Sequence, residues 1–84
     1  MVLSVLKTSP ATKAGFITSR RVGGAVVRNR VRRRLREIVR FDRPRLKPGC
    51  WLVLIARQKA AGAEFEELQR EWQALAARAG LFEP

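Results

Sequence analysis

The stretch GAVVRNRVRRRLREIVR, residues 24–40, decides how this chain folds and what it can bind. Its apolar residues recur every three or four positions, so on an α-helix they fall within an arc of about 80°. These residues are Val27, Val31, Leu35 and Ile38. Arginines occupy most of the other side of the same helix. We therefore predict an amphipathic helix that packs by one face and presents guanidinium groups on the other.

The arginine face of this helix needs a compensating anion. Like charges four residues apart on a helix cost roughly a few tenths of a kcal/mol each. Eleven arginines between Arg20 and Arg45 stand against Glu37 and Asp42, so this segment carries +9 of the net charge of +11. Arginine offers a planar fork of donors that fits phosphate oxygens. The segment predicts nucleic-acid binding in preference to a merely solvated charged face.

Two short β-prone runs, residues 2–6 and residues 15–19, precede the basic helix. A polar loop at residues 8–12 separates them, and this arrangement predicts a β-hairpin. The Gly23-Gly24 pair before the helix has two readings. It could be a glycine-rich turn that lets phosphate approach the helix N-terminus, or a plain strand-to-helix turn, which we favour. It is not a P-loop, because the Gly-Lys-Ser/Thr ending is missing.

The C-terminal half predicts a third strand and a second helix. A loop with prolines ends the basic helix, and residues 50–56 then form a continuous apolar run that predicts a strand buried on both faces. After a turn at residues 60–62, apolar residues recur three and four apart from position 65 to 79, with Gly80 as the expected C-cap. Acidic residues gather in the first turns of this helix, where they complement the helix dipole.

The expected order is therefore strand, strand, helix, strand, helix, an α+β two-layer sandwich. A chain of 84 residues that is 46% hydrophobic fits one folded domain, residues 1–84. Cys50, the single cysteine, suits a reducing compartment. The N-terminus lacks the basic region of a signal peptide, and no apolar run approaches the length of a membrane span. We expect a cytoplasmic protein with no membrane partner.

The sequence offers little for catalysis. It has no histidine, no cysteine pair for zinc, and Asp42 as its one aspartate. A protein nuclease usually needs several acidic metal ligands or a histidine acid–base pair. We therefore expect no catalytic residue, no metal site and no cofactor bound by the protein alone. Phe16 and Trp51 lie on expected strands, where core packing and stacking on an unpaired base are both open.

Residues 13–37 follow the pattern Lys-x-Gly-Phe-Ile-x-Ser-Arg-Arg-Val-Gly-x-Ala-Val-Val-Arg-Asn-Arg-Val-Arg-Arg-x-Leu-Arg-Glu, and residues 55–57 read Ile-Ala-Arg. A strand that ends in serine and two basic residues is followed by a glycine, and then an Arg-Asn-Arg block runs into a basic helix. This combination resembles the protein subunit of bacterial ribonuclease P. The likeness runs from about residue 16 to residue 57, and the flanking elements agree in type.

The resemblance implies a fold shared with a ribosomal-protein domain, with a left-handed β-α-β crossover where the general rule favours a right-handed one. It implies a non-catalytic subunit of a ribonucleoprotein endoribonuclease. The catalytic RNA, with Mg²⁺, cleaves precursor tRNA, while the protein binds that RNA and the 5′ leader and requires no protein partner. The positions that match the family's RNA-facing pattern are Arg20, Arg21, Arg28, Asn29, Arg30, Arg32, Arg33 and Arg36. The candidate leader contacts are Phe16 and Lys13.

The chain departs from the family at its start, where members usually carry a basic tail and a helix that supplies one wall of the leader cleft. We expect a single RNA-binding domain without that helix, which puts leader recognition in question. The alternative is a ribosomal protein or an rRNA-binding assembly factor on a similar fold. The Ser-Arg-Arg-Val-Gly turn and the Arg-Asn-Arg block favour the ribonuclease P subunit. A helix-turn-helix reader would need two adjacent helices, and a membrane-surface helix would carry bulkier apolar residues.

Overall fold

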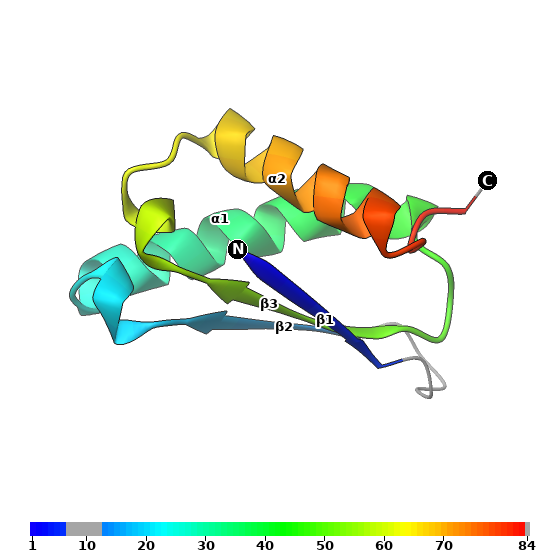
Figure 1. Ribbon diagram of the computed structural model, residues 1–84, viewed down its shortest axis with the longest axis horizontal. Coiled ribbons are helices and arrows are strands. Elements are labelled where there is room, and N and C mark those ends of the chain that lie inside the picture. Colours follow the sequence, from blue (N-terminus) through cyan, green and yellow to red (C-terminus); the bar gives the residue numbers. More distant parts are fainter. Residues whose placement is uncertain (7–12, 84) are drawn as a thin grey trace.

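The computed structural model describes residues 1–6 and 13–83, and its elements follow the predicted order (Figure 1). The strands are β1 (Val2–Leu6), β2 (Lys13–Thr18) and β3 (Trp51–Ala56), and the helices are α1 (Ala25–Asp42) and α2 (Phe65–Arg78). Three short 3-10 helices connect them: η1 (Arg20–Val22), η2 (Arg43–Arg45) and η3 (Gln58–Ala61). The α+β prediction is confirmed. The loop expected at residues 8–12 lies outside the described residues.

The sheet has β3 at its centre, in the order β1-β3-β2. β1 runs antiparallel to β3, with Val2 opposite Ile55, and β2 runs parallel to β3, with Lys13 opposite Trp51. The predicted hairpin is therefore wrong, because β1 and β2 each pair with β3 and not with each other. β3 carries the most continuous apolar sequence of the three strands. In the central position it pairs through both of its edges and sits deepest in the sheet.

The connection from β2 through α1 to β3 joins two parallel strands, and it is left-handed. In Figure 1 the chain runs along β2, returns through α1 above the sheet, and then runs along β3, which lies nearer the viewer than β2. Most such crossovers are right-handed, so this one is an exception to the general rule, as the resemblance implied. It places α1 over the β2 side of the sheet.

Both helices lie on the same side of the sheet, and no described helix or strand covers the other face, which we call the open face (Figure 1). On β3, Leu52, Leu54 and Ala56 point under the helices and are fully buried. The alternate residues lie on the open face, where Trp51 is 45% exposed and Ile55 is half-buried. The prediction that β3 is buried on both faces is therefore wrong, because a two-layer fold covers one face of the sheet.

The core lies between the covered face of the sheet and the apolar stripes of the two helices. From α1 come Val31, Leu35, Ile38 and Val39, and from α2 come Leu68, Trp72 and Ala76, all buried. Val27, at the start of the predicted stripe, is half-buried and packs against this core. The stripe that the spacing predicted is thus the face that α1 packs. Along the part of the chain that the structure describes, no helix is long and apolar enough to cross a membrane.

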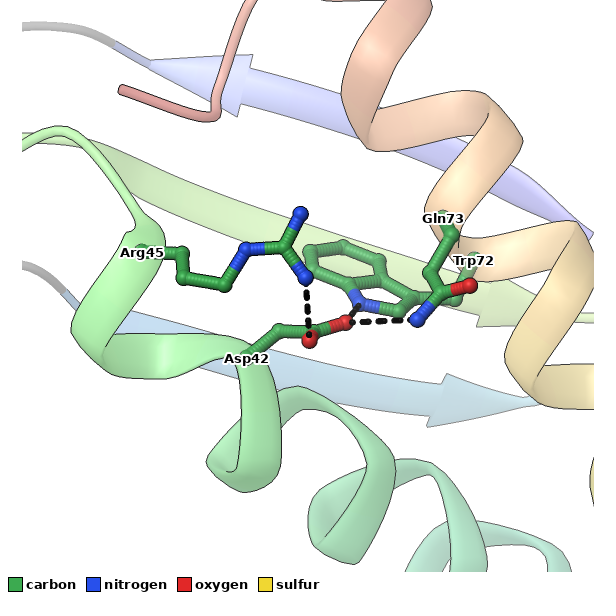
Figure 2. Close-up of polar contacts among 4 residues, drawn as sticks. All are labelled: Asp42, Arg45, Trp72 and Gln73. Carbon is green, nitrogen blue, oxygen red and sulfur yellow. Dashed lines mark hydrogen bonds and ion pairs between the residues drawn. The ribbon is translucent and has the colours of Figure 1, made fainter. Parts of the chain in front are cut away.

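A buried carboxylate joins the end of α1 to α2 (Figure 2). Asp42 is fully buried and accepts a 2.9 Å hydrogen bond from Nε1 of Trp72. The Gln73 amide and the Arg45 guanidinium also donate to this carboxylate, at 3.4 Å and 3.5 Å. A buried charge is tolerated when it is paired and hydrogen-bonded, as here. The contact fixes where α1 ends against α2.

The C-cap of α2 lies one position before Gly80, the predicted cap. The C-cap residue is Ala79, and Gly80 follows in the left-handed region with φ 70°. The Leu81 amide donates to the Ala76 carbonyl at 2.9 Å, which is the hydrogen bond of a Schellman motif. The positive φ explains the glycine, because an L side chain is strained there.

Candidate nucleic-acid interface

The turn between β2 and α1 places two arginines at the start of the basic segment. Ser19 caps the 3-10 helix η1, since its Oγ accepts a hydrogen bond from the Arg21 amide at 3.2 Å. The buried Val22 anchors this turn to the core, while Arg20 and Arg21 are exposed. The predicted RNA-facing arginines of the turn thus lie on the surface on a capped, anchored piece of chain.

The Gly23-Gly24 pair forms the junction between this turn and α1. Gly23 has φ 150°, and a Cβ added there would lie 3.0 Å from Cβ of Val27. Gly24 is the N-cap of α1, and its carbonyl accepts the first helical hydrogen bond from the Arg28 amide at 2.9 Å. Gly23 thus serves the strand-to-helix turn that we favoured, and Gly24 begins the helix. The phosphate reading of the same pair stays a hypothesis.

The outer face of α1 carries a hollow lined by arginines. Its volume is about 550 Å³, and it is lined by Val26, Asn29, Arg30, Arg32, Arg33 and Arg36. Five of these six residues are predicted RNA-facing positions. The Arg32 guanidinium donates a hydrogen bond to Oδ1 of Asn29, so the two side chains orient each other. The structure therefore brings most of the predicted helix residues into one cationic surface, which we call the outer hollow.

Two arginines at the edge of α1 contact the segment before α2, which consists of the end of η3 and the loop that follows it. The Arg30 guanidinium donates to the Ala61 carbonyl, and that of Arg34 donates to the Ala63 carbonyl, each at 3.4 Å. Arg34 was not a predicted RNA-facing residue, and this contact gives it a structural role. Arg30 has both roles, because it lines the outer hollow and also donates to the segment before α2.

Arg28 is half-buried, one helical turn before Arg32. Its Nε is buried and has no hydrogen-bond partner among the described residues. Buried donors are nearly always paired, and an unpaired one calls for an explanation. A water molecule or an oxygen of a ligand would each provide an acceptor.

A second cationic hollow lies between β2 and α1, and we call it the β2–α1 groove. Its volume is about 630 Å³. It is lined by Ala14, Phe16, Arg32, Arg36, Val39, Arg40, Arg43, Leu46 and Leu52. Arg32 and Arg36 line both hollows. The predicted RNA-facing positions did not include Arg40 and Arg43; Arg40 lies on the arginine face of α1, and Arg43 follows the end of the helix.

The two candidate leader contacts lie on opposite faces of β2. Phe16 is opposite Leu54 in the sheet register, so it points to the helix side and into the β2–α1 groove. Lys13 is opposite Trp51, so it lies on the open face. Exposed apolar side chains accompany it there, including Ile17 at 53%. One ligand segment cannot contact Phe16 and Lys13 on the same face of the sheet.

A third hollow lies where β2 and β3 end, and its lining has mixed charge. Arg21, Arg57 and Lys59 line it together with Glu67 and Glu71 of α2, around a volume of about 620 Å³. The carboxylates offset the cations, so this hollow attracts anions less than the two hollows of α1. Within residues 1–6 and 13–83, no three His, Cys, Asp or Glu side chains gather as a metal site would require.

A family model described as Ribonuclease P matches residues 1–80 of this chain. The ribonuclease P protein component of Symbiobacterium thermophilum is 46% identical over 84 residues, which cover 98% of this chain and 73% of that protein. That of Roseiflexus castenholzii is 51% identical over 71 residues, covering 83% and 58%. Among solved structures, the RNase P protein of Staphylococcus aureus has a TM-score of 0.80 at 22% identity and covers 96% of this chain and 77% of that one. The protein from Thermotoga maritima has a TM-score of 0.79 at 25% identity, with 90% and 74% covered.

Proposed function

Because this chain belongs to the ribonuclease P protein family, we propose that it binds the catalytic RNA of ribonuclease P and promotes removal of the 5′ leader from precursor tRNA. Its relatives are protein components of ribonuclease P, a ribonucleoprotein enzyme, and this favours the subunit over the ribosomal alternative. The chain spans 73% and 58% of the two relatives compared above, so the activity of the whole protein is part of the proposal.

The arginine surface of α1 is the observation that carries the proposal. The helix buries one stripe in the core and turns the outer hollow, with Arg30, Arg32, Arg33 and Arg36, to solvent. Each arginine that neutralises an RNA phosphate releases condensed counterions, so the surface contributes affinity that falls with salt. Arg20 and Arg21 add two exposed cations in the turn after β2. We propose that the RNA subunit contacts α1 and this turn.

The precursor tRNA leader is assigned to the open face of the sheet. Lys13, Ile17 and Trp51 lie there, and single-stranded nucleic acid binds surfaces that combine positive charge with aromatic side chains. Phe16 points to the other side of β2, so it is removed from the leader proposal.

Catalysis is assigned to the RNA, with Mg²⁺ bound there and not by this chain. The protein's part is to neutralise backbone charge, which favours the folded RNA and lowers the Mg²⁺ that it needs. We propose that this assembly works in the cytoplasm and requires no other protein.

Reconstitution tests the proposal. The chain is added to a bacterial ribonuclease P RNA at low Mg²⁺, and cleavage of precursor tRNA is followed with a long and with a short 5′ leader. We expect stimulation of cleavage, and weaker stimulation by Arg33→Ala than by Arg70→Ala, which removes one charge from α2 instead. Greater stimulation on the long leader supports the open-face assignment. A folded chain that neither binds this RNA nor stimulates cleavage overturns the proposal.

A further inference from the structure

We propose that the β2–α1 groove is a pocket for a single nucleotide, with the base on its apolar floor and the phosphate among the arginines of its rim. This inference does not depend on the proposed function, because it rests on the lining of one hollow. The outer hollow of α1 shares two arginines with the groove but contains no aromatic side chain. The two hollows therefore differ in the chemistry that they can recognise.

The floor of the groove is apolar and comes from three elements. Phe16 of the edge strand β2 is half-buried, and it packs against the core on one side while it lines the groove on the other. Val39 of α1 and Leu46 of the following loop complete the floor, and both are buried. An aromatic side chain beside aliphatic ones offers a surface on which a purine or pyrimidine ring can pack.

The rim of the groove is cationic. Arg32, Arg36, Arg40 and Arg43 line it, and none of the described lining residues is acidic. The two acidic residues of α1 do not line the groove. Asp42 is buried against Trp72, and Glu37 is exposed without lining the groove. Among the described residues that line the pocket, no carboxylate therefore offsets the attraction of Arg32, Arg36 and Arg40 for an anion, and the arginine fork suits phosphate oxygens.

The size of the groove agrees with this occupant. Its volume of about 630 Å³ lies within the range of roughly 300–1,000 Å³ that is usual for small-molecule sites. An inorganic anion would leave the floor unused, and an apolar compound would leave the rim unused. A nucleotide uses both, because it joins a flat ring to a phosphate. The same chemistry is offered by a free nucleotide and by an unpaired nucleotide within an RNA strand.

Calorimetry on the full chain separates the contribution of the apolar floor to binding from that of the arginine rim. ATP, adenosine and tripolyphosphate are titrated separately at physiological salt. We expect ATP to bind at least about tenfold more tightly than either of its two parts, which is the gain of about 1.4 kcal/mol expected when both surfaces are used. Equal binding of ATP and tripolyphosphate overturns the proposal, since the floor would then contribute nothing.

Matched variants locate the site. Phe16→Leu keeps an apolar side chain in the core, and we expect it to weaken ATP about fivefold or more without affecting tripolyphosphate. Phe41→Leu is its control, because Phe41 is an aromatic of α1 that is 73% exposed outside the groove. Arg40→Ala should weaken both ligands about tenfold, as expected for a charge-assisted hydrogen bond. Arg70→Ala on α2 should change little, and a loss equal to that of Arg40→Ala overturns the proposal. Thermal melts confirm that each variant is folded.

A short single-stranded RNA distinguishes the two sources of the nucleotide. If the RNA displaces ATP and loses affinity in Phe16→Leu, the pocket takes a nucleotide of an RNA strand. If RNA affinity is unchanged in Phe16→Leu while ATP affinity falls, the pocket takes a free nucleotide. Neither arm uses the ribonuclease P RNA or precursor tRNA. Failure of this proposal therefore leaves the result of the reconstitution unaffected.

Discussion

Replacing Asp42 by alanine should destabilise the fold more than any exposed substitution on α1. The loss leaves Nε1 of Trp72 buried without an acceptor, which costs about 1–3 kcal/mol. The longer contact with the Gln73 amide adds roughly 1 kcal/mol. The Arg45 contact adds about 0–1 kcal/mol, because that side chain is 62% exposed and screened by solvent.

Together these terms predict a loss of about 2–5 kcal/mol in the free energy of unfolding. That is a large share of the roughly 4–13 kcal/mol expected for a domain of this length. The measurement is urea unfolding followed by circular dichroism, which does not depend on Trp72 fluorescence. Asp42→Asn keeps an acceptor for the indole N–H and should lose clearly less than Asp42→Ala.

A double-mutant cycle with Trp72→Phe isolates the pair. Once the indole N–H is gone, Asp42→Ala no longer leaves that donor unpaired, so its cost should fall by at least about 1 kcal/mol. A loss below about 0.5 kcal/mol for Asp42→Ala, or a coupling energy near zero, would show that this carboxylate does not hold α1 to α2.

Further substitutions test the arginine surface and the turn before α1. Arg33→Ala should reduce the slope of log affinity against log salt for the ribonuclease P RNA by up to about 1, with the melting temperature unchanged; an unchanged slope removes Arg33 from the interface. Arg30→Ala should weaken RNA binding by about 1–3 kcal/mol and also lower the melting temperature, because it releases the loop before α2; wild-type affinity would contradict its assignment to the RNA surface. Gly23→Ala should lose about 1–3 kcal/mol of stability in a thermal melt, since its φ is 150° and its Cβ would meet Val27. Gly62→Ala, where φ is −101° and an added Cβ meets nothing within 4 Å, is the control, and equal losses for the two would refute the steric argument.

Hydrophobic periodicity was sufficient to predict both helices and the α+β class. The stripe that includes Val31, Leu35 and Ile38 is buried as expected, because it depends on local spacing. Strand pairing is not local. The short separation of β1 and β2 suggested a hairpin, but the stability of the sheet depends on where the most apolar strand lies. Likewise, the seven-residue apolar run did not reveal that one face of β3 is left open.

The same distinction holds for the candidate site. The outer hollow follows from helical spacing, so Asn29, Arg32 and Arg33 could be grouped from sequence. The β2–α1 groove depends on how a strand and a helix pack, and Arg43 lies beyond the end of that helix. The opposite orientations of Phe16 and Lys13 follow from their odd separation along β2, a signal that was present in the sequence once the strand's bounds were known.

The central position of β3 also bears on the order in which this chain can fold while it is being made. A nascent chain leaves the ribosome N-terminus first, and β1 and β2 are both paired with β3. Neither ladder can form before residues 51–56 have emerged. By then the arginines of α1 have already left the ribosome, on a helix whose apolar stripe has no sheet to pack against. Synthesis of the third strand is thus the step at which a basic, unpaired segment becomes a domain.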